Sequence, residues 1–306
     1  MGVVTEEKNT LKNHVSDWLE GARIRTLPAA VAPVIAGAAI AFSEDAFSWT
    51  RTILAALVAI FLQIGVNFSN DYSDGVRGTD EFRSGPPRLT GGGKVSPKIV
   101  LMIAFGFFFA AALAGLILVA LTGQWWLLAI GALAILAAWF YTGGKNPYGY
   151  LGLGEVFVLI FFGYVATVGT VYTQSGTAPP LAWIVATAIG VIACALLMVN
   201  NIRDIPTDIK ANKRTLAVRL GDASARTAFV GMLVFAPLLT ALTSFYTYPL
   251  LGITALLLFV VPCLSKPVST GKTGRDLIIV LRNTGFFELS YAVLVAILLV
   301  VSKLAF

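Results

Sequence analysis

Long apolar runs separated by short polar connections dominate the pattern along this chain of 306 residues. A membrane-spanning helix needs about 20 mostly apolar residues, with a range of roughly 17–25. Nine stretches approach this length: 27–42, 52–68, 99–121, 125–141, 156–171, 181–199, 228–242, 248–264 and 286–304. A span must satisfy its own backbone hydrogen bonds, and the alternation typical of membrane β-barrels is absent. The pattern therefore predicts nine transmembrane α-helices.

Composition supports the same fold class. Hydrophobic residues make up 57% of the chain and charged residues only 12%, whereas soluble domains average roughly 25% charged residues. We therefore expect an all-α integral membrane protein with one transmembrane domain over residues 1–306. Within it we expect a cytoplasmic N-terminal segment, 1–22, and two aspartate-rich cytoplasmic loops, 67–98 and 200–227.

The placement of basic residues predicts the orientation. With the N-terminus in the cytoplasm, the cytoplasmic segments hold 20 of the 22 Lys and Arg residues, and only Arg51 and Lys303 fall elsewhere. Cytoplasmic loops of membrane proteins carry such an excess. The expected location is the cell membrane, with several crossings. A basic face beside anionic lipid accounts for the net charge of +6 without a nucleic-acid partner.

Two acidic segments carry the candidate chemistry. In the first, Asn70 and Asp74 are four residues apart, so a helix would place them on one face. In the second, Asn200, Asp204 and Asp208 form a row at the same spacing. Pro206 lacks a backbone donor and is expected to kink or end that helix. Asp208 is therefore the least firmly placed member of the row.

The two segments follow predicted spans two and six, which suggests two similar halves of four helices. Such a repeat predicts that both segments face one central cavity. Asp and Asn also favour helix ends, so one segment alone would be compatible with capping. Transporters contain repeats as well, and a secondary transporter stays open as an alternative. That alternative predicts acidic residues near the middle of the membrane.

The residue types favour magnesium over softer metals. The chain has a single histidine, His14, and its two cysteines, Cys194 and Cys263, fall inside predicted spans. Carboxylate and amide oxygens suit Mg²⁺, which is usually held by one or two carboxylates together with substrate phosphates. Basic residues accompany the acidic ones in sequence or topology: Lys145, Arg203, Lys210, Lys213 and Arg214. This combination points to a diphosphate bridged by Mg²⁺.

These motifs resemble the UbiA-type intramembrane aromatic prenyltransferases, which have an Asn-x-x-x-Asp-x-x-x-Asp pattern and a later Asp-x-x-x-Asp pattern. Gly78 stands where the third acid of the first pattern belongs, and Asp80 is the nearest acid. That offset is similar to the menaquinone branch, whose members prenylate 1,4-dihydroxy-2-naphthoate. Segments 23–28, 85–90, 141–155, 200–204 and 213–221 also match, so the resemblance covers nearly the whole chain.

The resemblance implies a helical bundle around a cavity open to the cytoplasm and to the bilayer, and transfer of a polyprenyl group from its diphosphate with loss of CO₂. Another acceptor, of the 4-hydroxybenzoate type, stays open. Two Mg²⁺ ions would be held by Asn70, Asp74, Asp80, Asn200, Asp204 and Asp208. Catalytic roles fall to Asp71, Asp74, Lys145, Asp204 and Asp208. Substrate contacts fall to Arg23, Arg25, Asn67, Arg77, Arg88, Tyr141, Lys145, Glu155, Asn201, Arg203, Lys213 and Arg214.

Overall fold

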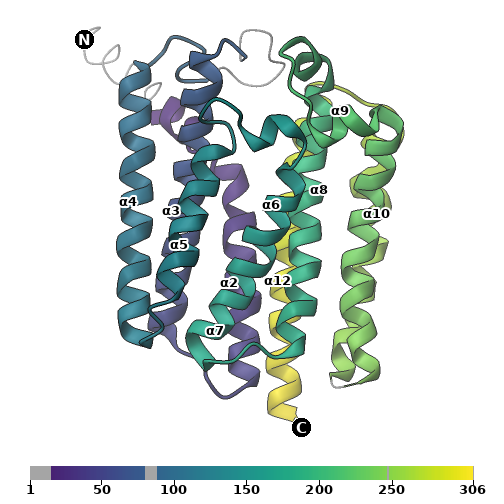
Figure 1. Ribbon diagram of the computed structural model, residues 1–306. Coiled ribbons are helices and arrows are strands. Elements are labelled where there is room, and N and C mark those ends of the chain that lie inside the picture. Colours follow the sequence, from purple (N-terminus) through teal and green to yellow (C-terminus); the bar gives the residue numbers. More distant parts are fainter. Residues whose placement is uncertain (1–14, 80–87, 247, 306) are drawn as a thin grey trace, which may run out of the picture.

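The computed structural model describes residues 15–79, 88–246 and 248–305, and all regular structure in these ranges is helical (Figure 1). The main helices are α2 (Leu27–Ser43), α3 (Trp49–Val76), α4 (Pro97–Thr122), α5 (Leu127–Phe140), α8 (Pro180–Lys210), α10 (Asp222–Ala241) and α12 (Asp276–Ala305). The shorter ones are η1 (Ile24–Thr26), η2 (Tyr148–Leu151), α6 (Gly154–Val158), η3 (Leu159–Val168), α7 (Gly169–Ser175), α9 (Leu216–Leu220), η4 (Leu242–Phe245), η5 (Pro249–Phe259) and α11 (Val261–Ser269). The predicted all-α class is confirmed.

Eight helical stretches of the described chain are long and apolar enough to cross a membrane. Several combine shorter elements, as in Gly154–Ser175, where α6, the π-helix η3 and α7 form one continuous rod. The remaining predicted span, 125–141, corresponds to α5, an apolar helix of 14 residues. A helix of that length rises only about 21 Å, which is short of a full hydrocarbon core. The chain is thus a multi-pass membrane protein, and the number nine stays a prediction.

Helix α8 is central to the bundle. In its most apolar stretch 67% of residues are buried, against 28% for α3 and α4, which therefore lie at the periphery. Around α8 pack α10, η3 and α12, and α12 packs in turn against α2. Ile189, Phe229 and Leu233 are completely buried in this core. Two of its polar groups pair with each other, since the hydroxyls of Thr240 and Tyr291 lie 2.5 Å apart.

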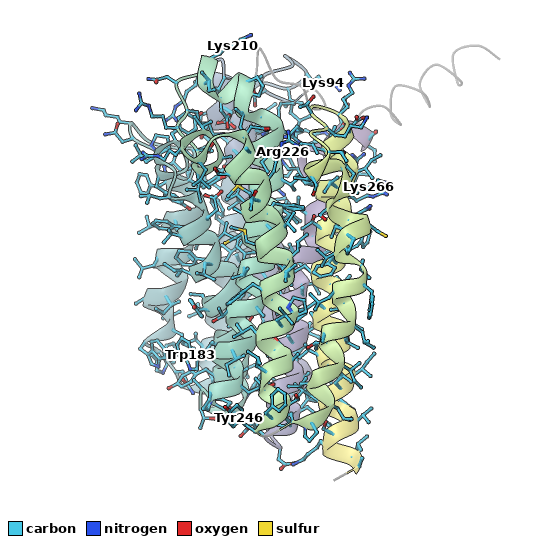
Figure 2. All side chains as sticks on the ribbon, turned by 90° about the vertical axis from the view of Figure 1, so that its right-hand side faces the viewer. Lys94, Trp183, Lys210, Arg226, Tyr246 and Lys266 are labelled. Atoms are coloured by element: carbon cyan, nitrogen blue, oxygen red, sulfur yellow. The ribbon has the colours of Figure 1, made fainter. Side chains whose placement is uncertain are left out.

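The basic and the aromatic residues labelled in Figure 2 lie toward opposite ends of the bundle. Lys94, Lys210, Arg226 and Lys266 lie toward one end, whereas Trp183 and Tyr246 lie toward the other (Figure 2). Helices α3 and α8 both finish at the basic end (Figure 1). Because the last turns of α3 and α8 carry aspartates beside these basic residues, we call this end of the bundle the acidic end.

Among the described residues, the aspartates of 67–76 and 200–210 lie on helices, so helix extends into the two segments expected as aspartate-rich loops, 67–98 and 200–227. Helix α3 continues to Val76, so Asn70 and Asp74 share a helical face. Helix α8 runs through Pro206 to Lys210, and Pro206 does not end it. Proline removes only one backbone donor. The following turn is held by the Thr207 hydroxyl, which donates to the carbonyl of Asp204 at 2.8 Å.

Candidate functional site

A cavity of about 540 Å³ lies between the two acidic rows. Helix α3 contributes Asn70 and Asp74 to its lining, and α8 contributes Asn200, Asp204 and Asp208. The prediction that both segments line one cavity is therefore confirmed. Asp208 belongs to the row because α8 stays helical past Pro206.

Away from the acidic end the wall of this cavity is apolar. Small and aliphatic side chains from α2, α3, α4, α5, η3 and α7 line it. Five aromatic residues also line it: Tyr141, Tyr148, Phe157, Phe161 and Phe162. The rings of Tyr148 and Phe157 stack with centroids 3.9 Å apart.

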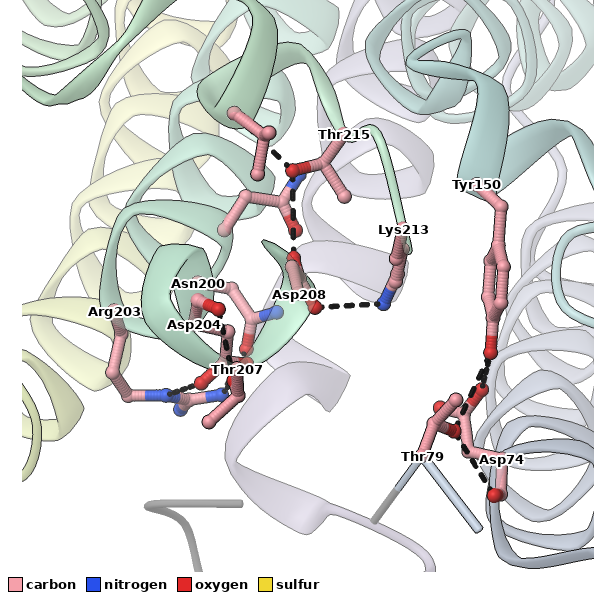
Figure 3. Close-up of polar contacts among 12 residues, drawn as sticks. Asp74, Thr79, Tyr150, Asn200, Arg203, Asp204, Thr207, Asp208, Lys213 and Thr215 are labelled. Carbon is pink, nitrogen blue, oxygen red and sulfur yellow. Dashed lines mark hydrogen bonds and ion pairs between the residues drawn. The ribbon is translucent and has the colours of Figure 1, made fainter. Parts of the chain in front are cut away.

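Lys213 supplies positive charge inside the cavity (Figure 3). Its ammonium nitrogen lies 3.6 Å from Oδ1 of Asp208 and 5.2 Å from the centre of the Tyr150 ring. Burial by itself would lower the pKa of Lys213, but the carboxylates of Asp74 and Asp208 outweigh it and raise the pKa above the ordinary lysine value. Lys213 therefore stays charged over the working pH range.

Tyr150 connects three parts of the site, and the sequence did not single it out. Its hydroxyl donates to Oδ1 of Asp74 at 2.9 Å (Figure 3). Its carbonyl accepts from the backbone N–H of Arg214 at 3.0 Å, and the guanidinium of Arg77 lies over its ring. Burial, followed by the charge of Asp74, raises the pKa of Tyr150, so the phenol remains a donor. Only the fold distinguishes it from the other tyrosines.

Arg203 stabilises the second acidic row instead of facing the cavity. Its Nε and Nη2 donate to the two carboxylate oxygens of Asp204 at 2.7 and 2.5 Å, and Nη2 also donates to Asn200 at 2.9 Å (Figure 3). Such a bidentate pair fixes both partners in orientation. Arg203 thus has a structural role in this row, and its expected contact with substrate stays a prediction.

Asp71 also has a structural role. Its two carboxylate oxygens accept the backbone N–H groups of Leu89 and Thr90 at 3.0 and 2.8 Å. Asp71 is buried and is not among the residues that line the cavity. Asp71 thereby anchors the segment before α4, and the catalytic role expected for it stays a prediction.

Replacing Asp71 with alanine is expected to destabilise the fold by about 1–3 kcal/mol, because two buried backbone donors lose their partner. The free energy of unfolding in detergent measures this effect. Asp276→Ala is a matched control, since Asp276 pairs with Lys272 at an exposed position. Equal stabilities of the two variants would contradict the anchoring role.

The other predicted site residues divide into three groups. The cavity lining includes Arg23, Asn67, Arg88, Tyr141 and Lys213. Four residues are exposed and do not line the cavity: Arg25, Arg77, Lys145 and Arg214. Their contacts with substrate stay predictions. Glu155 and Asn201 are buried away from the lining and are bonded to each other at 3.2 Å. Asp80 lies outside the described residues.

Two further residues order the first acidic row. The Thr142 hydroxyl donates to Oδ1 of Asn70 at 2.7 Å, which orients the amide. Arg88 lies 3.7 Å from Oδ2 of Asp74. Asn67 donates to the carbonyl of Ala22 at 2.9 Å and so ties α3 to the chain before α2. A lone threonine after α5 carries no signal that could have identified Thr142 in advance.

The oxygen donors around the cavity suit a hard divalent cation. Among the described residues, no three carboxylate, imidazole or thiol groups converge into a preformed metal cluster. Mg²⁺ does not need such a cluster, because it keeps waters and binds one or two carboxylates together with substrate phosphates. The separated carboxylates of Asp74, Asp204 and Asp208 fit that mode of binding. Lys213 between them fits an anion in the same space.

Comparison with known sequences gives consistent matches. The sequence model of the UbiA prenyltransferase family matches residues 30–269. The 1,4-dihydroxy-2-naphthoate octaprenyltransferase of Mycobacterium tuberculosis is 47% identical over 282 residues, which cover 92% of this chain and 96% of that protein. The protein of the same name from Escherichia coli is 41% identical over 215 residues, covering 68% and 70% of the two chains.

Solved structures share the fold. The apo structure of a UbiA homolog from Aeropyrum pernix K1 superposes with a TM-score of 0.68 at 17% identity, covering 91% of this chain and 98% of that one. A UbiA homolog from Archaeoglobus fulgidus bound to GPP and Mg²⁺ gives a TM-score of 0.66 at 14% identity, covering 93% and 99%. At these identities the likeness concerns the fold alone.

Proposed function

Because the chain belongs to the UbiA prenyltransferase family, we propose that it transfers a polyprenyl group from polyprenyl diphosphate to 1,4-dihydroxy-2-naphthoate. The products are demethylmenaquinol, CO₂ and diphosphate. One observation carries the proposal: a single cavity combines separated carboxylates and a lysine at one end with an apolar body. The names of the relatives described above support the choice of acceptor.

The diphosphate is held at the acidic end. Lys213 binds it directly, and two Mg²⁺ ions would be held by Asn70, Asp74, Asp80, Asn200, Asp204 and Asp208. When bound, Mg²⁺ stabilises the negative charge that develops on the departing diphosphate. Tyr150 holds the carboxylate of Asp74 in place, and Arg203 does the same for Asp204. The protein thus orients the ligand oxygens before the substrate arrives.

The prenyl chain occupies the apolar body of the cavity, where water is excluded. Cleavage of the allylic C–O bond leaves its electron pair on diphosphate, and the allylic carbon gains cationic character. The rings of Tyr141, Tyr148 and Phe157 face the same space and stabilise that charge.

The naphthoate attacks through the carbon that bears its carboxylate. The new C–C bond forms there, the C–CO₂ bond breaks, and its electron pair restores the aromatic ring. The exchange of CO₂ for the prenyl group balances without removal of a ring proton. Arg23 and Arg88 line the cavity and bind the carboxylate of the acceptor.

We place the acidic end and the N-terminus in the cytoplasm of a cell-membrane protein. The concentration of lysine and arginine at this end supports the orientation (Figure 2). Helix α5 serves as the ninth crossing, with Trp125 and Trp126 before it and Tyr141 after it extending the apolar stretch. The cavity opens to the cytoplasm and to the bilayer, from which the lipid substrate enters.

The test uses purified protein, octaprenyl diphosphate and naphthoate labelled at the carboxyl carbon. With Mg²⁺, labelled CO₂ and prenylated naphthoquinol are expected in equal amounts, and removal of Mg²⁺ with EDTA should abolish both. Product from 4-hydroxybenzoate but not from the naphthoate would contradict the acceptor. Full activity in EDTA would contradict the role of the metal. A transporter would form no product from any acceptor.

A further inference from the structure

Three glycines from three helices lie at one level of the cavity wall. Gly115 of α4, Gly131 of α5 and Gly169 of α7 all line the cavity. The helix ends opposite the acidic end are Thr122 of α4, Leu127 of α5 and Ser175 of α7. The glycines lie seven, four and six residues from these ends, in the same order. At 1.5 Å per residue, each lies about 6–10 Å from that opposite end. We call these three residues the glycine level.

Neither backbone geometry nor packing requires glycine at these positions. None of the three has a positive φ. A Cβ added to Gly131 or Gly169 would meet no atom within 4 Å, and one added to Gly115 would meet only a methyl group at 3.8 Å. In contrast, a Cβ on Gly163 would lie 2.7 Å from a backbone oxygen of α8. Glycine inside a helix costs about 0.8–1.0 kcal/mol relative to alanine. The three residues therefore contribute open space.

Polar contacts close the bundle beyond the glycine level. The Gln174 side chain at the end of α7 accepts the backbone N–H of Ser48 at 2.8 Å, and its carbonyl accepts Arg51 at 2.9 Å. These bonds join α7 to the start of α3. A chain that extends from the acidic end through the cavity thus reaches the glycine level shortly before this closure.

We infer that the glycine level gives a long prenyl chain its room in the far part of the cavity, and so decides how well the protein uses long donors. The inference rests on the proposed function, since it takes the diphosphate at the acidic end as the starting point of the chain. A short prenyl group ends before the glycine level and does not depend on it. A long one needs the space that Gly115, Gly131 and Gly169 leave open. Larger side chains there should therefore discriminate against long donors alone.

The experiment compares Gly131→Leu and Gly169→Leu with the unmodified protein, using geranyl and octaprenyl diphosphate with the naphthoate acceptor. We expect the ratio of kcat/KM for the long donor to that for the short donor to fall by about tenfold or more, the discrimination that a few methylene groups give in an apolar pocket. Gly106→Leu and Gly231→Leu are matched controls, because a Cβ there also meets nothing within 4 Å but neither residue lines the cavity. Their ratios should not change.

An unchanged ratio in active leucine variants would overturn the inference and leave the proposed function intact. Equal loss of both donors would also overturn it, since the glycine level would then not select for length. If the unmodified protein transfers neither prenyl group, the proposed function itself fails. The series Gly131→Ala, Val and Leu guards against misfolding, because the ratio should fall stepwise even where only the smaller variants fold.

Discussion

Replacing Asp74 with asparagine is expected to lower kcat/KM for prenyl transfer by about 10²–10³-fold, the loss typical when one group that stabilises developing charge is removed. Asparagine keeps the shape of Asp74 and can still accept from the Tyr150 hydroxyl, but it brings no negative charge for Mg²⁺. Steady-state kinetics over a range of Mg²⁺ concentrations measure the effect. High Mg²⁺ should restore part of the activity.

Asp204→Asn should cause a loss of similar size with a second consequence. It leaves the buried guanidinium of Arg203 without its counter-charge, so the thermal midpoint should fall as well. Asp276→Asn is the control, because Asp276 is exposed and pairs only with Lys272 at the surface. If Asp74→Asn and Asp204→Asn are as active as this control, the acidic rows are not the metal ligands.

Replacing Lys213 with glutamine is expected to lower kcat/KM by about 10²-fold, which is the second large effect. The carboxylates on both sides keep Lys213 charged, so its loss removes a full positive charge from the place where diphosphate departs. Lys213→Arg should restore part of the activity, because it keeps the charge but not the compact ammonium group. Kinetics with saturating naphthoate and varied prenyl diphosphate separate binding from turnover.

Lys145→Gln decides between the two lysines that could bind phosphate. The sequence resemblance implies Lys145, whereas the structure places Lys213 in the cavity and Lys145 at an exposed position. We expect Lys145→Gln to behave like Lys210→Gln, an exposed control on the last turn of α8, with little loss. A loss as large as that of Lys213→Gln would return the phosphate contact to Lys145.

The fold was predictable because membrane helices are specified by composition over a long window. Each predicted span overlaps a helix, and errors arose at the acidic end, where polar residues mark the limit of the apolar stretch but not of the helix. Helix α3 runs eight residues past the predicted end of its span at Phe68. Hydropathy cannot detect that extension, because side chains such as Asp74 face a cavity and not lipid.

The acidic rows of the site were predictable because helical spacing places their members on one face. Most partners of those rows were not, because Tyr150, Thr142 and Lys213 come from other parts of the chain, and the direction of the Arg203 side chain is not given by the pattern. Arg203 was expected to bind substrate, but its guanidinium fits the carboxylate of the next residue. Asp71 and Asp74 are only three residues apart, yet Asp71 accepts from the backbone N–H of Thr90, whereas Asp74 lines the cavity. Such assignments depend on tertiary contacts.

The contact of Tyr150 with both Asp74 and the chain after α8 has a consequence for biogenesis. As the ribosome delivers the chain from its N-terminal end, Asp74 enters the membrane long before Lys213 has been synthesised. Arg88, which lies 3.7 Å from the Asp74 carboxylate in the folded protein, is available early, whereas Tyr150 and Lys213 arrive later. We expect the newly inserted N-terminal helices to remain loosely associated, with Asp74 hydrated, until α8 and the following turn arrive. Maturation of the enzyme would then end with the closing of this contact.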